Sequence, residues 1–344
     1  MAIFQPSFDN KRQNIRDIIP LKVPFHIGIE PTRYCNLKCF FCQHSTRGEF
    51  DDIFVKKGQE LRHMNFDFFK KIIYDIMELP EQPKKIQFVG MGEPILNPEL
   101  GKMIRHLRSS GFTGRIITYT NGVALTPQIA DELVDSGLTS LQISVYGITK
   151  EDFETLAEVS IDIDKYIENI RYLFVHKKKL QIRLKTTDDV VTTETKRKLF
   201  LNMFNNICDQ IFVEHIINIP NQMGRIKVKA RNITQYSETL GNCREICPWM
   251  FYQSHINIDG DVFFCDILAK PKEYAIGNIR NSSFVAIWNG SARNELLCTG
   301  LKYGQNAITQ CIDCDDRFSM TAPEEYLDDC REELLVRLRS QKGG

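Results

Sequence analysis

The fold is decided by the segment 25–42, which reads FHIGIEPTRYCNLKCFFC. Its first six residues are typical of a buried β-strand, and Pro31 ends that strand. Cys35, Cys39 and Cys42 follow in the spacing C-x3-C-x2-C. In a parallel α/β sheet, ligands bind beyond the carboxyl ends of the strands. The three cysteines are therefore expected at a ligand-binding edge.

Working outward from this segment, short β-type runs alternate with helical segments as far as residue 214. The expected strands are residues 25–30, 85–89, 115–119, 140–145, 180–185 and 210–214. The expected helices are residues 65–79, 98–110, 127–136, 151–157, 164–176 and 193–206. Strands that alternate with helices indicate right-handed βαβ crossovers, so we expect an α/β fold with a parallel sheet.

The pattern changes after about residue 220, where the segments become shorter. Residues 255–258 and 262–265 flank Asp259-Gly260, which predicts a two-residue β-hairpin. Pro323 is well placed to start a terminal helix over residues 324–340. We therefore expect a four-part organisation. Its parts are an N-terminal extension (1–24), an α/β unit (25–220), a small cysteine-bearing unit (221–322) and a C-terminal helix and tail (323–344).

Charge and composition exclude several functions. The 344 residues contain 44 basic and 44 acidic side chains, so the net charge is zero and a dedicated nucleic-acid binder is not expected. No apolar run reaches the roughly 18 residues of a membrane span, and the N-terminus lacks the apolar core of a signal peptide. We expect a cytoplasmic protein without a membrane partner. The 11 cysteines, an odd number, are then not expected to form a disulfide framework.

The thiolates of Cys35, Cys39 and Cys42 could cap three corners of a cubane iron–sulfur cluster. The fourth iron would lack a protein ligand and could chelate a small molecule, as a catalytic zinc ion keeps an open position. A zinc site completed by His44 is the alternative that the spacing leaves open.

With the aromatic Phe41, the motif C-x3-C-x-aromatic-C resembles that of the radical S-adenosylmethionine (SAM) enzymes. Three companion motifs of that family follow in order at the ends of the next three expected strands. These motifs are Gly90-Met91-Gly92-Glu93-Pro94, Thr120-Asn121-Gly122 and Ser144. The resemblance implies a partial (β/α)6 TIM-like barrel.

The resemblance also implies where SAM binds. Gly90, Gly92 and Glu93 would receive its amino group, since glycines permit close backbone approach and a carboxylate pairs with an ammonium group. Asn121 and Ser144 match further cofactor-binding positions. The arginine that many relatives carry after the fourth strand is absent from 151–156. Arg183 or Lys185, on one face of the fifth strand, could replace it or could instead form a solvated strand face.

The chemistry implied is reductive cleavage of SAM by the cluster of Cys35, Cys39 and Cys42. A reductant such as flavodoxin or ferredoxin would supply the electron. The resulting 5′-deoxyadenosyl radical would abstract hydrogen from an unactivated carbon of the substrate.

Four later cysteines suit either a fully ligated cluster or a zinc ribbon: Cys247, Cys265, Cys311 and Cys314. Their layout resembles the auxiliary-cluster extensions called SPASM and twitch domains. The two further ligand positions of the two-cluster form fall on Met320 and Glu324, so we expect one auxiliary cluster and two [4Fe–4S] clusters in all. The spacing is similar to that of the cyclitol-oxidising 2-deoxy-scyllo-inosamine dehydrogenase family.

Four cysteines have no assigned role: Cys208, Cys243, Cys298 and Cys330. Among them, Cys243 and Cys298 are candidate hydrogen donors. Four side chains near expected strand ends or cluster loops are candidate substrate contacts or packed residues: His63, Tyr146, Asp188 and His215.

The favoured reaction is oxidation of an alcohol carbon in a sugar-like or aminocyclitol substrate, with the auxiliary cluster as electron acceptor. Radical epimerisation with a cysteine hydrogen donor and peptide maturation are alternatives. The roughly 24 residues before the first strand are too few for the peptide-binding module of many maturases. A zinc-stabilised binding protein is the non-enzymatic alternative.

Overall fold

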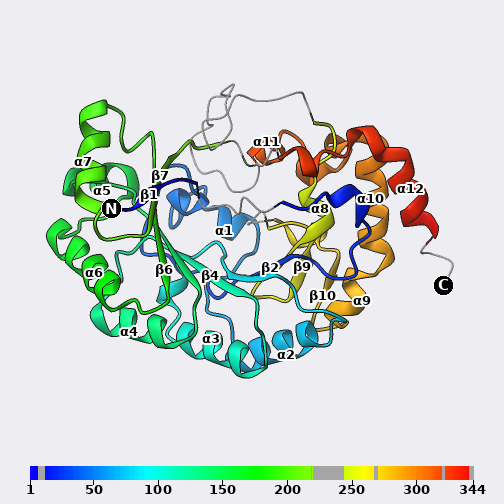
Figure 1. The fold of residues 1–344 in the computed structure, drawn as a ribbon, viewed down its shortest axis with the longest axis horizontal. Helices are drawn as coiled ribbons and strands as arrows, with labels where there is room; N and C mark the ends of the chain where they lie inside the picture. Colours follow the sequence, from blue (N-terminus) through cyan, green and yellow to red (C-terminus); the bar gives the residue numbers. More distant parts are fainter. Residues whose placement is uncertain (7–11, 218, 220–243, 267–269, 320–321, 341–344) are drawn as a thin grey trace.

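The structure is a computed structural model that describes residues 1–6, 12–217, 219, 244–266, 270–319 and 322–340. Six parallel strands form the centre of one sheet: β2 (His26–Ile29), β3 (Lys85–Phe88), β4 (Arg115–Thr120), β5 (Ser140–Ser144), β6 (Gln181–Thr187) and β7 (Gln210–Glu214). The helices between them cover the outside of the sheet in an arc (Figure 1). These helices are α2 (Phe66–Met77), α3 (Leu100–Ser109), α4 (Pro127–Asp135), α5 (Lys150–Ala157), α6 (Ile163–His176) and α7 (Glu194–Phe204). The expected α/β partial barrel is confirmed.

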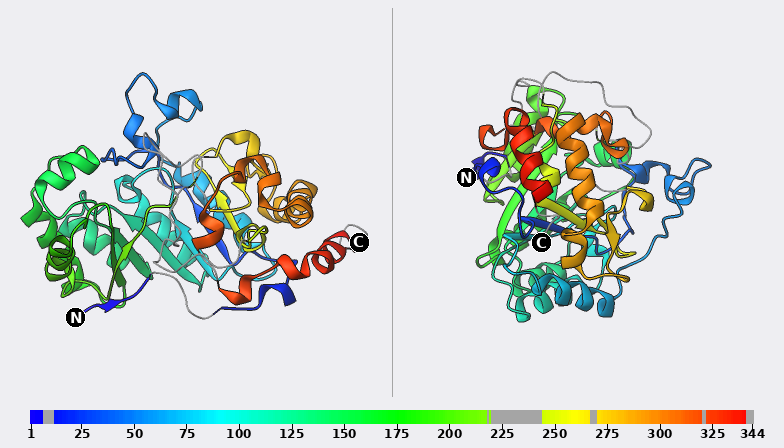
Figure 2. Two further views of the ribbon diagram at one scale, coloured as in Figure 1. Left: turned by 90° about the horizontal axis from the view of Figure 1, so that it is seen from above. Right: turned by 90° about the vertical axis from the view of Figure 1, so that its right-hand side faces the viewer.

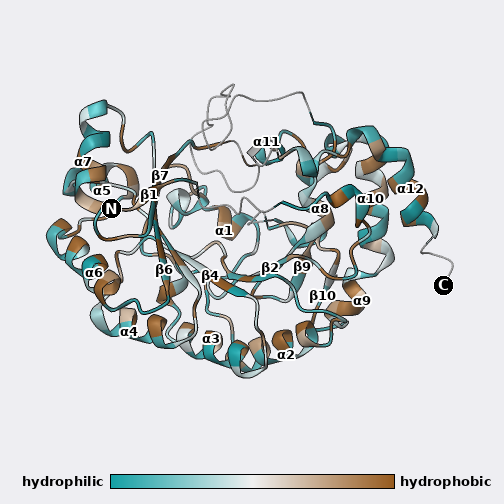
Figure 3. Cartoon of the chain, viewed as in Figure 1, coloured by the Kyte–Doolittle hydropathy of each residue, from teal (hydrophilic) through white to brown (hydrophobic). Residues whose placement is uncertain are grey.

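Helix α2 illustrates how the sequence produces this arc. Phe69, Ile72 and Ile76 recur at helical spacing and are buried against the sheet, whereas Tyr74 is exposed. The side chain of Asn65 accepts hydrogen bonds from the first turn and so caps the helix. The same two-sided pattern of hydropathy recurs along the outer helices (Figure 3). Burial of one apolar face per helix therefore holds the layer of helices on the strands.

The sheet continues beyond both edges of the barrel and reaches ten strands in the described residues. On one side, β1 (Ile3–Phe4) pairs in parallel with β7. On the other, β8 (Gln253–Ile256) pairs in parallel with β2 over their whole lengths. β9 (Asp261–Phe263) and β10 (Gly277–Asn278) then add antiparallel strands. The cysteine-bearing C-terminal part is thus joined to the barrel through backbone hydrogen bonds.

The predicted hairpin exists, but its turn is longer than expected. Ile256 pairs with Val262, and the N–H of Gly260 donates to the carbonyl of Asn257 (3.0 Å). The N–H of Asn257 also donates to the carbonyl of Asp261 (3.0 Å), so three residues, 258–260, connect the two strands where two were expected. Gly260 has φ +92°, a conformation that L side chains rarely adopt.

The C-terminal part also contains α8 (Trp249–Tyr252), α9 (Phe284–Trp288), α10 (Ser291–Tyr303), α11 (Asp316–Ser319) and α12 (Arg331–Ser340). The prediction of one helix over residues 324–340 is wrong at its start. Pro323–Glu325 and Asp328–Cys330 are two short 3-10 turns, because Glu325 points inward to Arg12 (2.7 Å) and Leu327 is fully buried between the turns. None of the helices in the described ranges is long and apolar enough to cross a membrane.

Candidate active site

The three cysteines that follow β2 lie on one loop that is packed against the end of α5. The N–H groups of Lys38 and Phe40 donate to the carbonyls of Ala157 and Leu156 (2.9 and 3.0 Å), and the N–H of Cys42 donates to Cys39 (2.9 Å). α1 (Ile53–Lys56), in the segment that follows this loop, stands out from the body in both views of Figure 2.

Burial is the main cause that raises the pKa of each thiol of this loop. The pKa of Cys35 rises to about 12. That of Cys39 rises well above its ordinary value through burial and then through the nearby thiols of Cys42 and Cys35. Thiolates are therefore unfavourable here unless a positive metal centre compensates their charge. The donor set is three cysteine residues close to one another, with Cys39 buried and Cys35 and Cys42 half-buried, and it fits an iron–sulfur cluster with one open iron.

His44 is held by contacts other than a metal. Arg47 donates to its Nδ1 (3.0 Å), so Nε2 carries the proton and donates to the carbonyl of Met91 (2.8 Å). In the described part of the chain, no group of three or more His, Cys, Asp or Glu side chains is arranged around a single metal ion. Thiolates that cap different irons of a cubane are spaced more widely than ligands of one zinc ion. Both ring nitrogens of His44 are engaged in hydrogen bonds, and the three sulfurs are not gathered around one ion. These two observations disfavour a zinc site completed by His44.

Backbone hydrogen bonds connect the glycine-rich loop after β3 (90–94) to the segment that leads into the cysteine loop. The N–H groups of Gly92 and Glu93 donate to the carbonyls of Thr32 and Tyr34 (3.2 and 2.7 Å). A Cβ atom on Gly92 would lie 2.6 Å from the carbonyl oxygen of Thr32 and would also overlap that of Tyr34. A glycine is thus required at position 92 by the close approach of two backbones.

We expect Gly92→Ala to displace the cysteine loop, because the atoms that it meets are backbone atoms and cannot rotate away. The cluster of Cys35, Cys39 and Cys42 should be lost, so that iron falls from about eight to about four per chain. Gly58→Ala is the matched control: its Cβ meets no atom within 4 Å, and φ +60° adds only backbone strain of about 1–2 kcal/mol. Full iron content in the Gly92→Ala protein would contradict this account.

Glu93 is buried between the ends of β3 and β4. Its Oε2 accepts from the N–H of Asn121 (2.7 Å) and its Oε1 from that of Ile95 (3.3 Å). Burial raises the pKa of Glu93 to about 7, although these hydrogen bonds oppose the rise. The side chain of Asn121 in turn donates to Asn36 Oδ1 (2.8 Å) in the cysteine loop. Glu93 and Asn121 thus connect the loops that surround the cavity described next.

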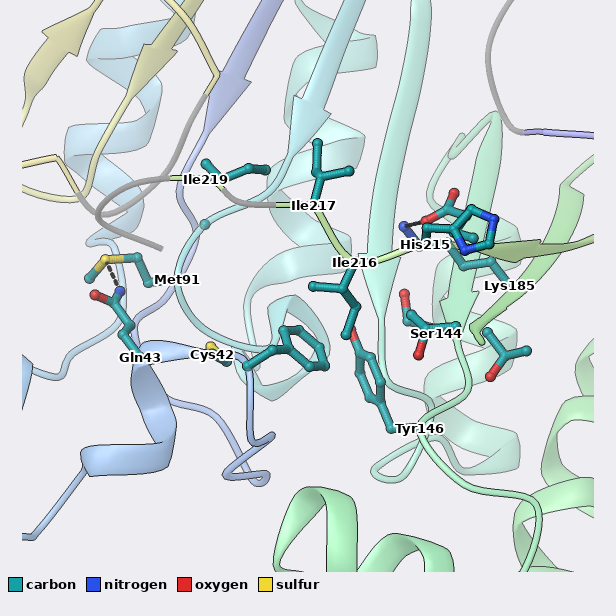
Figure 4. A pocket seen from close by; sticks show the side chains of 15 residues that line it. Cys42, Gln43, Met91, Ser144, Tyr146, Lys185, His215, Ile216, Ile217 and Ile219 are labelled. Atoms are coloured by element: carbon teal, nitrogen blue, oxygen red, sulfur yellow. Dashed lines mark hydrogen bonds and ion pairs between the residues drawn. The ribbon is translucent and has the colours of Figure 1, made fainter. Parts of the chain in front are cut away.

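A cavity of about 260 Å³ opens at the carboxyl ends of the strands (Figure 4). Five of the residues predicted to bind cluster or SAM line it: Phe41, Cys42, Gly90, Ser144 and Lys185. Ten further residues complete the wall: Gln43, Met91, Tyr146, Thr186, Thr187, Glu214, His215, Ile216, Ile217 and Ile219. Gly92, Glu93, Asn121 and Arg183 are not among the lining residues, and the first three support the loops around it.

Lys185 and His215 lie on the side of the cavity opposite Cys42 (Figure 4), and each belongs to an ion pair. Lys185 Nζ is 2.7 Å from Glu214 Oε2, and His215 Nδ1 is 2.8 Å from Asp188 Oδ2. Both pairs join the end of β6 to the end of β7. Arg183 lies two residues earlier on β6, where it donates to Gln181 (3.0 Å). The cavity therefore has a sulfur side and a charged side.

His63 does not line the cavity. Its backbone forms an isolated antiparallel β-bridge with Thr32, and its ring is 4.8 Å from that of Tyr34. Cys298 is on α10, where its thiol contacts Asn294 (3.5 Å), and it does not line the cavity. Cys208 and Cys330 donate to nearby backbone carbonyls. Cys243 lies outside the described residues.

Glu30, at the end of β2, connects the site to the C-terminal part and was not singled out from the sequence. It is 1% exposed, and its carboxylate accepts from the N–H groups of Met91 (3.0 Å) and Ile258 (3.2 Å). The buried Arg33 bridges Glu30 (3.2 Å) and Asp259 (2.6 Å). A charged residue that ends an apolar strand just before the cysteines is the signal that could have found it.

Cys247, Cys265, Cys311 and Cys314 come together beside this connection. Burial raises the pKa of Cys247, Cys311 and Cys314, and the proximity of the thiols to one another raises it further. The side-chain amide of Gln305 donates to the carbonyls of Cys311 and Cys314 (2.9 and 3.1 Å), which orders the C-x2-C turn. These four sulfurs form a second donor set that fits a cluster with every iron ligated.

Asp266, the residue after Cys265, reaches into the barrel. Its carboxylate accepts from His255 Nδ1 (2.9 Å) and from Gln87 Nε2 (3.1 Å). A Cβ on Gly28 of β2 would be 2.6 Å from His255 Nδ1 and would overlap Asp266 as well. The small residue in β2 therefore makes room for the contact between barrel and C-terminal part.

Comparison with known proteins agrees with this geometry. The family model of the radical SAM superfamily matches residues 29–197, and that of the SPASM iron–sulfur cluster-binding domain matches residues 247–315. The chain resembles dTDP-4-amino-4,6-dideoxy-D-glucose ammonia-lyase of Streptomyces venezuelae, with 28% identity over 43% of this chain and 28% of that protein. It also resembles PqqA peptide cyclase of Bradyrhizobium diazoefficiens, with 24% identity over 66% of this chain and 51% of that protein. It thus spans about half or less of these curated relatives.

Two solved structures share the fold. BtrN in complex with AdoMet and 2-DOIA has a TM-score of 0.55 at 17% identity, over 88% of this chain and 98% of that one. anSMEcpe with bound AdoMet has a TM-score of 0.57 at 14% identity, over 92% of this chain and 97% of that one. The matched domains imply SAM and [4Fe–4S] clusters as cofactors. The chain is therefore a member of the radical SAM superfamily that carries a SPASM-type iron–sulfur cluster-binding domain after its barrel.

Proposed function

We propose that this enzyme oxidises an alcohol carbon of a sugar-like or aminocyclitol substrate to a carbonyl. The observation that carries the proposal is the cavity of about 260 Å³ with Cys42 on one side and two ion pairs on the other. Its size suits a small molecule, and its charged side suits one that is rich in hydroxyl or amino groups.

Cys35, Cys39 and Cys42 would hold one cluster, and Gly90, Ser144 and Lys185 would contact SAM beside it. When bound, this pair of cofactors supplies the reductive cleavage that removes one hydrogen atom from a substrate C–H bond. A reductant such as flavodoxin or ferredoxin would provide the electron for that cleavage.

Oxidation then requires the loss of the hydroxyl proton and of one electron. His215 would accept the proton, because it lines the cavity and the contact of its Nδ1 with Asp188 Oδ2 (2.8 Å) holds the ring in place. The centre held by Cys247, Cys265, Cys311 and Cys314 would accept the electron. One hydrogen atom, one proton and one electron together equal the two hydrogens that separate an alcohol from a ketone.

Two of the similar proteins support a sugar-like substrate. One is the ammonia-lyase of an amino sugar, and the other is BtrN, crystallised with 2-DOIA. Peptide maturation finds support in PqqA peptide cyclase and in Streptococcus suis SuiB bound to the precursor peptide SuiA, whose fold is similar at a TM-score of 0.51. Epimerisation would need a thiol at the cavity that does not hold the cluster; Cys298 does not line the cavity, and Cys243 lies outside the described residues.

The test is anaerobic turnover of the reconstituted protein with SAM, dithionite and a panel of aminocyclitols and nucleotide sugars. We expect a ketone product that is two hydrogens lighter than its substrate, equimolar with 5′-deoxyadenosine. A redox-neutral product would overturn the proposal. An epimer that gains one carbon-bound deuterium in deuterated water would indicate the epimerase reaction, and turnover restricted to a peptide would indicate a maturase.

His215→Gln and Asp188→Asn test the proton acceptor within the same experiment. Hydrogen abstraction does not need a base, so 5′-deoxyadenosine should still form while the yield of ketone falls. The pH profile of ketone formation should change in both variants. Equal losses of 5′-deoxyadenosine and ketone, with an unchanged pH profile, would show that these residues only maintain the structure.

A further inference from the structure

Lys270 is buried against a sulfur of the second cysteine group. The residue is 3% exposed, and its Nζ donates to Cys265 Sγ at 2.7 Å. The rings of Phe263 and Phe264 lie 5.9 and 5.1 Å from the same Nζ. A lysine is seldom buried without a specific partner, so this placement calls for a chemical reason.

The charge of Lys270 reaches more than one ligand of the auxiliary centre. It opposes the rise that burial causes in the pKa of Cys311, so it acts on that sulfur as well as on Cys265. Asp316 acts in the opposite sense on Cys247 and Cys314. The auxiliary cysteines thus have a cationic side, at Lys270, and an anionic side, at Asp316.

The cationic side faces the barrel. Lys270 lines a small pocket of about 10 Å³ together with Glu30, Arg33 and Met91, and Met91 also lines the active-site cavity. Met91 is therefore a wall of both the active-site cavity and the pocket that Lys270 lines.

We propose that Lys270 raises the reduction potential of the auxiliary cluster by donating a hydrogen bond to the sulfur of Cys265 from a position shielded from water. One-electron reduction adds a negative charge to the cluster. A nearby cation and a hydrogen bond to sulfur both stabilise the reduced form, and shielding from water strengthens both effects. Lys270 thereby makes this cluster an electron acceptor.

The inference needs an auxiliary cluster at these four cysteines but does not need the alcohol oxidation proposed above. If the enzyme proves to be a peptide maturase, the effect of Lys270 on the potential stays as described. In the titration, dithionite reduces the auxiliary cluster. During turnover, the electron would come from the substrate radical that the enzyme forms.

The test is an EPR-monitored redox titration, with dithionite as the reductant, of the full-length protein carrying both clusters. Lys270→Met removes the charge and the donor, Lys270→Gln keeps a donor without charge, and Lys270→Arg keeps both. We expect the midpoint potential of the auxiliary cluster to become more negative in all three variants. The shift should be largest in Lys270→Met, smaller in Lys270→Gln and smallest in Lys270→Arg. Lys179→Met, at an exposed lysine on the barrel, is the matched control and should leave the midpoint unchanged.

Iron content is measured in each variant, so that loss of the cluster is not mistaken for a shift. If Lys270→Met fails to hold the cluster, the midpoint potentials of Lys270→Gln and Lys270→Arg are compared with each other. A more negative midpoint in Lys270→Gln supports the proposal. Equal midpoints in the wild type and in every variant that holds its cluster would overturn it. Ketone formation is assayed separately, so failure of the proposed reaction and failure of this inference give different results.

Discussion

Replacement of Cys42 by alanine is expected to abolish SAM cleavage completely. Cys42 is one of three sulfurs on the loop after β2, and its side chain lines the cavity (Figure 4). Without it the cluster loses a ligand, and iron should fall from about eight to about four per chain. No 5′-deoxyadenosine should be detected by liquid chromatography after incubation with SAM and dithionite.

Cys247→Ala provides the matched comparison. It should remove the auxiliary cluster and so cause the same loss of iron, yet 5′-deoxyadenosine should still form, because the loop of Cys35, Cys39 and Cys42 is intact. Cys330→Ala, at a half-buried cysteine whose thiol donates to the carbonyl of Leu327, should behave as wild type. If Cys42→Ala retained SAM cleavage, the assignment of the two cysteine groups would have to be abandoned.

Replacement of Glu30 by alanine is expected to produce the largest loss of stability of any single substitution considered. Glu30 is 1% exposed and accepts hydrogen bonds from Met91 and Ile258 and from the guanidinium of Arg33. Breaking a buried ion pair by removing one partner costs about 3–5 kcal/mol, because the other charge stays buried. Arg33 keeps its bond to Asp259, so we expect the lower part of that range.

The measurement is the midpoint of denaturant unfolding of the cluster-free protein, which separates folding from metal binding. Glu78→Ala, at an exposed position at the end of α2, is the control and should change stability by less than about 0.5 kcal/mol. Glu30→Gln keeps the shape of the side chain, so its loss of stability should lie between those of Glu78→Ala and Glu30→Ala. A Glu30→Ala protein as stable as the control would refute a role for Glu30 in joining the barrel to the C-terminal part.

The barrel could be predicted because the central strands are short runs of β-type residues, either mostly apolar or, as in β6, alternating apolar with polar. The predicted strands and helices differ from the observed ones by a few residues at each end. The same local signals predicted the hairpin after residue 250. In each case the deciding information lay within about ten consecutive residues, which is the range that propensity and periodicity describe.

The features that escaped prediction depend on contacts between distant segments. β1 is only two residues long and exists because β7 offers it a partner. The expected terminal helix is broken because Glu325 bonds to Arg12, more than three hundred residues earlier in the chain. Lys270 carries no motif at all, and only the fold places its ammonium group against Cys265. None of these pairings leaves a signal in the local sequence.

The pairing of β8 with β2 has a consequence for how the protein is made. β2 and its partner β8 are separated by more than two hundred residues, so the edge of the barrel next to the cysteine loop stays uncovered until synthesis has passed Ile256. An uncovered edge strand is a template for pairing with other chains. A ribosome that stalls before that point would therefore leave a nascent barrel with an unpaired edge strand that is prone to aggregation. Completion of the C-terminal part closes that edge.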